Sequence, residues 1–201
     1  VLFRSHMKKD KTRNLTVTAI LVALIFVLGL TPLGLIPLGF INVTILALPV
    51  IVGTLSLGLS SGLTLGFFFG LASLLSVLGL SMTPPSSLAG TLLAASPVLT
   101  VVMCFLPRLL VPLFTHLVYK AFIDKTNRKI AIPVAAATGS LTNTVFYLGL
   151  MYLFYQLAAL DATKVVSLIL GVAFVAGISE AAVSALLAFP IIIALDKIQK
   201  R

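Results

Sequence analysis

Short links that are either charged or rich in glycine and proline divide the chain into six long apolar stretches. The stretches occupy residues 15–30, 43–59, 62–80, 91–122, 130–157 and 165–195. A helix needs about 20 largely apolar residues to cross a hydrocarbon core of about 30 Å. Only 9% of the residues are charged, against roughly 25% in a soluble domain. The sequence therefore predicts an all-α integral membrane protein, a single bundle of six transmembrane helices.

Turn-forming residues predict two of the boundaries between these helices. Ser60-Ser61 is expected to form a tight turn between the second and third stretches. Pro97, Pro107 and Pro112 interrupt the fourth stretch, and proline removes a backbone hydrogen bond inside a helix. We therefore expect a membrane-embedded loop or short helix first, and then a helix from about Pro107 to Phe122.

Basic residues gather at three places, all of which fall on one side of the membrane if there are six spans. Only Lys164 then lies on the opposite side. Since Lys and Arg concentrate in cytoplasmic loops, both termini are expected in the cytoplasm. The three clusters are Lys8, Lys9, Lys11 and Arg13; Lys120, Lys125, Arg128 and Lys129; and Lys197, Lys200 and Arg201.

The net charge of +9 does not indicate a nucleic-acid partner. The basic clusters carry no interleaved aromatic residues, and they are interpreted as orientation signals beside membrane spans. Residues 1–6 are interpreted as a cloning remnant ahead of Met7, so that residues 7–201 form the single membrane domain.

Motifs for catalysis are missing from the sequence. There is no glycine-rich phosphate loop, no pair of acids in one span, and no zinc-ligand spacing among His6, His116 and Cys104. We therefore expect no enzyme activity, no catalytic residue, no metal site and no cofactor in this chain. Cys104 is interpreted as a small apolar filler.

Three polar residues within the apolar stretches matter most, because an ionisable group inside a membrane span indicates a functional site. At a rise of ~1.5 Å per residue, Arg108 lies roughly 18 Å from the cytoplasmic face and Asn143 roughly 20 Å. Glu180, counted from the outer face, lies roughly 22 Å down. A cation, an amide and a carboxylate at similar depth could bind a small polar substrate with a carboxylate and hydroxyls. The alternative is a structural Arg108–Glu180 ion pair, and the two roles can coexist.

The run Thr142-Asn143-Thr144 also places three hydrogen-bonding side chains in one buried helix, where they either line a cavity or bond between helices. Small residues form two further patterns. Gly58, Gly62, Gly66 and Gly70 repeat every four residues, which favours close helix packing, and Ala19 and Ala23 give a shorter pattern of the same kind.

Six motifs in a fixed order resemble the substrate-binding S components of energy-coupling factor (ECF) vitamin transporters. The resemblance covers residues 15–200. The motifs are GFINVT at 39–44, LPVIVG at 48–53, GFFFGL at 66–71 with Ser73, PRLL at 107–110, GSLTNT at 139–144 with Gly149, and GISEA at 177–181.

The resemblance implies a multi-pass protein of the plasma membrane that binds a vitamin from outside with high affinity. Its partners would be a transmembrane T component, which Ala19 and Ala23 would contact, and two ATP-binding subunits, which would hold ATP and Mg²⁺. The pocket would be closed by the loops at 31–42 and 81–90.

The pattern is most similar to the pantothenate-specific members. Pantothenate is an anion with two hydroxyls and an amide, so its carboxylate would suit Arg108. The substrate-binding residues implied are Asn42, Arg108, Thr142, Asn143 and Glu180. Pro112, Thr115 and His116 depart from the usual pattern, which leaves the role of His116 open. Riboflavin, cobalamin, folate and a thiamin precursor remain alternatives, as do a scaffold without a ligand, an intramembrane enzyme and a secondary transporter.

Overall fold

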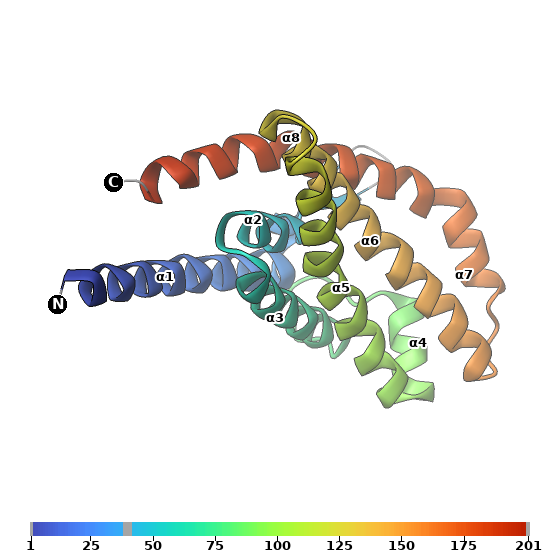
Figure 1. The fold of residues 1–201 in the computed structure, drawn as a ribbon. Coiled ribbons are helices and arrows are strands. Elements are labelled where there is room, and N and C mark those ends of the chain that lie inside the picture. Colours follow the sequence, from blue (N-terminus) through green and yellow to red (C-terminus); the bar gives the residue numbers. More distant parts are fainter. Residues whose placement is uncertain (1, 38–41, 200–201) are drawn as a thin grey trace.

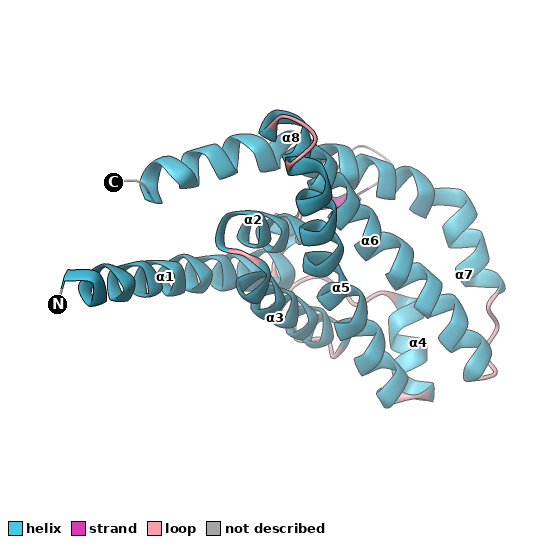
Figure 2. Cartoon of the chain, viewed as in Figure 1, coloured by secondary structure: helices cyan, strands magenta, loops and turns pink. Residues whose placement is uncertain are grey.

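A computed structural model describes residues 2–37 and 42–199 and is almost entirely helical (Figures 1 and 2). The one sheet in these residues is a short antiparallel hairpin, in which Leu35 pairs with Thr44 and Pro37 with Asn42. The long helices are α1 (Leu2–Leu30), α3 (Leu59–Val77), α5 (Pro97–Ile123), α6 (Arg128–Leu157) and α8 (Phe174–Gln199). The shorter elements are η1 (Pro32–Gly34), β1 (Leu35–Pro37), β2 (Asn42–Thr44), α2 (Ala47–Leu57), α4 (Ser87–Ala95), α7 (Thr163–Leu168) and the π-helical turn η2 (Ile169–Ala173).

Four helical segments in the described part of the chain are long and apolar enough to cross a membrane. They are Thr12–Leu30, Leu59–Val77, Pro97–Ile123 and Phe174–Lys197. Helix α6 has the length but is less apolar, because it carries a largely polar run at residues 138–144. The protein is therefore a helical bundle of the integral membrane class.

Helix α2 occupies the centre of this bundle, with every side chain of residues 47–54 buried. A helix that is apolar on all sides is a buried one, and α2 packs against α1, α3, α5, α6 and α8. Its 11 residues are fewer than the predicted span of 43–59. They cover only about 16 Å at ~1.5 Å per residue. The prediction was too long because the β-branched run Val43-Thr44-Ile45 favours extended backbone, and Val43 and Thr44 pair with β1.

The helix break after α2 lies at Gly58, which has φ of +94°, rather than at the predicted Ser60-Ser61 turn. Only glycine adopts that backbone region without strain. Ser60 and Ser61 already belong to the first turn of α3.

The next three glycines of the repeat pack α3 tightly against its neighbours. A Cβ on Gly66 would lie 2.6 Å from the carbonyl oxygen of Arg108, and one on Gly70 would lie 2.7 Å from Phe105 Cδ1. Gly62 faces Thr54 of α2 and Pro112 of α5. The predicted role in close packing is confirmed for these three positions, which we call the glycine seam.

Helix α5 runs unbroken through Pro107 and Pro112, so the predicted start near Pro107 is wrong. Proline lacks the N–H that would reach the carbonyl four residues earlier. For Pro107 that carbonyl belongs to Met103, and the Arg108 side chain replaces the missing donor, with Nη1 at 3.0 Å from Met103 O. Substitution of a side-chain donor for a backbone donor explains how the helix continues.

Candidate functional site

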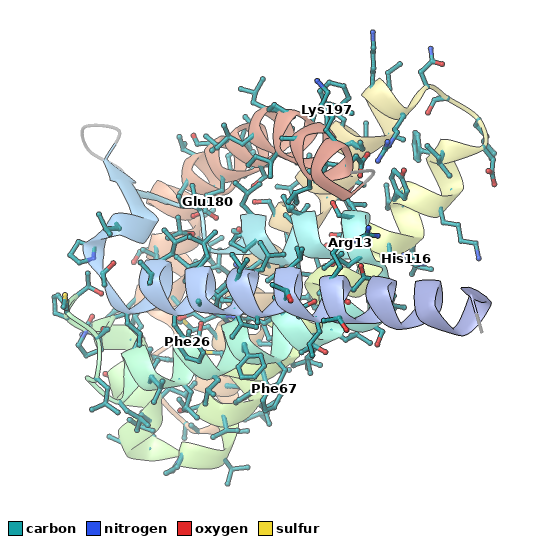
Figure 3. All side chains as sticks on the ribbon, turned by 90° about the vertical axis from the view of Figure 1, so that its left-hand side faces the viewer. Arg13, Phe26, Phe67, His116, Glu180 and Lys197 are labelled. Carbon is teal, nitrogen blue, oxygen red and sulfur yellow. The ribbon has the colours of Figure 1, made fainter. Side chains whose placement is uncertain are left out.

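A cavity of about 290 Å³, which we call the polar cavity, is lined by all three of the predicted intramembrane residues, Arg108, Asn143 and Glu180. Arg108 reaches it from α5, Asn143 from α6 and Glu180 from α8. In Figure 3 Glu180 lies toward the hairpin end of the molecule, whereas Arg13, His116 and Lys197 lie toward the opposite end. The remaining lining residues are Thr44, Leu46, Phe69, Ser73, Thr144, Tyr147, Leu148, Ala176 and Gly177.

The guanidinium of Arg108 is buried, with 8% of the residue exposed. It lies over two aromatic rings, 4.6 Å from the centroid of Tyr147 and 5.3 Å from that of Phe69. Such cation–π contacts stabilise a desolvated cation and fix its plane. Nε is buried and has no hydrogen-bond partner among the described residues. A rigid guanidinium with a spare donor can bind a carboxylate.

Glu180 is not paired with Arg108, since the described residues contain no ion pair between them. Its Oε1 instead accepts hydrogen bonds from the backbone N–H of Thr44 at 3.0 Å and from Thr44 Oγ1 at 2.7 Å. Oε2 accepts one from Thr144 Oγ1 at 3.3 Å. The structural Arg108–Glu180 pair is therefore not formed, and Glu180 joins α8 to β2 and α6.

The three residues of the polar run on α6 have different surroundings. Asn143 lines the polar cavity, and its Oδ1 is buried without a partner in the part of the chain that the structure describes. Thr144 also lines the cavity. Thr142 does not line it, and its hydroxyl donates to Thr138 O of its own helix at 2.8 Å. Asn42 begins β2, but its side chain lies outside the described part.

A second cavity, of about 190 Å³, adjoins the first, and we call it the loop cavity. The two share Thr44, Leu46, Ser73, Arg108 and Tyr147. The loop cavity adds several hydroxyls and the thiol of Cys104, from Thr31, Ser76, Thr83, Ser86 and Cys104. Cys104 is buried, as expected for an apolar filler, and it also lines the loop cavity.

Several lining residues were missed from the sequence. Tyr147 follows Asn143 by four positions, so helical spacing could have found it. Phe69 and Ser73 belong to the GFFFGL motif with Ser73, but no role at the site was predicted for them. Thr44 gave no such signal, because its position depends on the hairpin. Among the described residues there is no group of three or more His, Cys, Asp or Glu that could hold a metal ion.

Ala19 and Ala23 lie on an exposed face of α1. They neighbour exposed apolar residues, including Ile20 at 62% and Leu24 at 41%. Their contact with a partner stays a prediction, as does substrate binding by each cavity residue.

A family model described as ECF transporter, substrate-specific component, matches residues 13–192. The matched segment contains the hairpin, both cavities and most of every long helix. A curated relative is the pantothenic acid transporter PanT of Lactococcus lactis subsp. cremoris (strain MG1363). It is 30% identical over 203 aligned residues, which cover 87% of this chain and 98% of the relative.

Proposed function

The chain belongs to the family of substrate-specific components of ECF transporters, and from this premise we propose that it binds pantothenate for import. The family description, a substrate-specific component of a transporter, supports a substrate-binding membrane subunit rather than an enzyme. The relative in Lactococcus is named for pantothenic acid, which supports this substrate over other vitamins.

The main support for this proposal is the environment of Arg108. A buried cation between two rings, with Nε unpartnered and no described carboxylate in ion-pair range, favours an anionic ligand. Pantothenate supplies one carboxylate. Its hydroxyls and amide N–H are donors, which suit the buried Oδ1 of Asn143.

A ligand-free scaffold is a weaker alternative. That hypothesis expects no cavity and an Arg108–Glu180 pair that satisfies itself. The polar cavity of about 290 Å³ lies near the lower end of the ~300–1,000 Å³ common for ligand sites, and Glu180 bonds to threonines instead.

In the membrane, the chain makes six spans with both termini in the cytoplasm. The ion pair between Arg128 at the start of α6 and Asp196 near the end of α8 supports this arrangement. It brings the basic link after α5 and the basic end of α8 to one side, as the positive-inside rule requires. Here α2 and the residues before it act together as the second span.

The partners are a transmembrane T component and two ATP-binding subunits, which bind ATP and Mg²⁺ while this chain binds no cofactor. Ala19 and Ala23 contact the T component, since exposed small residues let another helix approach closely. Replacing both with leucine should stop uptake and leave ligand binding intact. Loss of both activities, or of neither, would count against this contact.

The test of the substrate is equilibrium binding of radiolabelled pantothenate to the purified protein in detergent. Riboflavin, folate, cobalamin and thiamin serve as competitors. We expect binding that only unlabelled pantothenate displaces. Displacement by another vitamin would correct the substrate, and no binding to folded protein by any of them would reject the proposal.

A further inference from the structure

We propose that Glu180 is a positioning residue that fixes the wall shared by the two cavities, and that it acts through Thr44. The proposal rests on the proposed function only in treating these cavities as the ligand site. It replaces the expectation that the carboxylate of Glu180 contacts the ligand or pairs with Arg108.

Three hydrogen bonds from protein groups hold the carboxylate of Glu180. Its Oε1 accepts both the N–H and the hydroxyl of Thr44, and its Oε2 accepts the hydroxyl of Thr144, which also lies 3.4 Å from Ser140 O. Hydrogen bonds to an ionised acceptor are stronger than neutral ones, and they are stronger still away from water. The two bonds to Thr44 connect residues 136 positions apart in sequence, so no local structure could hold them together.

Thr44 has the right position for this role. It is the last residue of β2, and both Thr44 and Leu46 line the polar cavity and the loop cavity. The backbone is held on one side by pairing of Thr44 with Leu35 and on the other by the bond from Ile45 N to Gly34 O at 3.1 Å. The two bonds from Thr44 to Glu180 join this segment to α8, which also lines the polar cavity through Ala176 and Gly177. Without Glu180, the wall would lose these hydrogen bonds to α8.

Close packing of α6 and α8 supports the same geometry. A Cβ on Gly177 would lie 3.0 Å from Thr144 Cγ2, so the two helices approach closely one turn before Glu180. The close approach of α6 therefore holds the backbone of α8 in place beside Glu180. A positioning residue needs such a fixed backbone.

Cys104 provides a measurement that does not depend on any ligand. It is the single cysteine of the chain, it is 1% exposed, and it lines the loop cavity together with Thr44 and Leu46. The rate at which methyl methanethiosulfonate modifies Cys104 in the purified full-length protein therefore reports access to the cavity whose lining includes Thr44.

We expect Glu180→Ala to raise the modification rate by roughly tenfold or more, because it removes bonds to a charged acceptor. Thr44→Val, which removes one of these bonds, should raise it by about threefold. The double variant should react no faster than Glu180→Ala, since both changes break the same contacts. Glu180→Gln keeps an acceptor for Thr44 and should restore most of the protection. Ser179→Ala is the matched control on α8, because that hydroxyl bonds only its own helix, at Val175 O.

Independent, multiplying effects of Glu180→Ala and Thr44→Val would overturn the proposal, because Glu180 would then act elsewhere. An unchanged rate in folded Thr44→Val protein would overturn it even if Glu180→Ala did not fold. Pantothenate binding tests whether the carboxylate also contacts the ligand. If Glu180→Gln binds as weakly as Glu180→Ala while protecting Cys104, the carboxylate contacts the ligand directly, which overturns the claim that Glu180 acts through Thr44. If the wild-type chain does not bind pantothenate, the proposed function fails, and the modification rates still decide the role of Glu180.

Discussion

The glycine seam between α3 and α5 is filled to contact distance, whereas the polar cavity beside it leaves a buried donor and a buried acceptor without partners among the described residues. Both regions meet at Arg108. Its backbone carbonyl lies where a Cβ on Gly66 would be only 2.6 Å away, and its side chain extends into the cavity. On the seam the polar groups are satisfied locally, as in the bond from Thr54 Oγ1 to Val50 O at 2.7 Å.

This difference shows how one helix can serve both packing and binding. The seam fixes the backbone of α5, and the rings of Phe69 and Tyr147 fix the guanidinium plane. The ligand then meets a group whose orientation is already set, which lowers the entropy lost on binding. Substitutions that change either the glycine seam or the polar cavity alone can test whether packing and binding are separate in this way.

The largest effect is expected for Arg108→Ala. Truncating one partner of a buried charge pair costs about 2–5 kcal/mol, so the Kd for pantothenate should rise at least roughly 30-fold. Equilibrium binding with the labelled vitamin measures this. Unchanged affinity in folded protein would remove Arg108 from the site.

Arg108→Ala also deprives Met103 O of its donor, and a companion variant separates that effect. In Pro107→Ala/Arg108→Ala, the restored backbone N–H can bond Met103 O, so the unfolding temperature should recover while binding stays lost. If binding recovers too, the role of Arg108 is structural.

Next in size is Gly66→Ala, which acts on the seam. Overpacking a close contact costs about 1–3 kcal/mol, and here the opposing atom is a backbone oxygen that cannot rotate away. Thermal unfolding in detergent should show the loss, together with weaker binding because the backbone of Arg108 must shift. Gly90→Ala on α4 is the control, since nothing lies within 4 Å of its added Cβ. Equal losses in the two variants would mean that the seam is not tightly packed.

The same two regions show how far the sequence could predict the structure. The repeat of glycines predicted the seam, because close packing needs small residues at helical spacing. Arg108, Asn143 and Glu180 could be selected because polar groups are rare in apolar stretches. Their contacts could not be predicted. An ion pair with Arg108 was the alternative considered for Glu180, but the structure has Glu180 bonded to Thr44. The position of Thr44 depends on a hairpin, which could not be recognised in the apolar run that begins at residue 43.

The other wrong prediction was the helix start near Pro107. It assumed that a proline, which lacks a backbone N–H, must end or begin a helix. Pro107 continues α5 since the next residue supplies the missing donor through its side chain. That compensation depends on the folded conformation of Arg108, which no spacing rule describes. Thr142 was predicted to bind substrate together with Asn143. The two are adjacent on α6 and therefore point in different directions, so that Asn143 lines the polar cavity and Thr142 bonds its own helix.

Asn143→Ala should have a smaller effect, on binding alone. Losing one hydrogen bond to the ligand costs about 0.5–1.5 kcal/mol, or roughly 2- to 10-fold in Kd. Without ligand, stability should not fall, because the buried Oδ1 has no described partner to lose. Thr142→Ala is the neighbouring control and should leave Kd unchanged, since its hydroxyl bonds α6 itself. If Thr142→Ala weakens binding as much as Asn143→Ala, the cavity does not define the site.

The smallest effect is expected for Arg128→Ala, at the end of the molecule remote from the cavity. Arg128 and Asp196 form an ion pair whose side chains are 43% and 21% exposed. Exposed pairs contribute about 0–1 kcal/mol and weaken with salt. A double-mutant cycle with Asp196→Ala, measured by unfolding at low and high salt, should therefore give a coupling below about 1 kcal/mol, with pantothenate affinity unchanged. A coupling above about 2 kcal/mol would mean that this pair, rather than the contacts of Gly177 and Glu180, holds α6 to α8. Arg128 would then contribute as much to the stability of the helical bundle as Arg108 contributes to ligand binding, and the contrast between the exposed and the buried arginine would not hold.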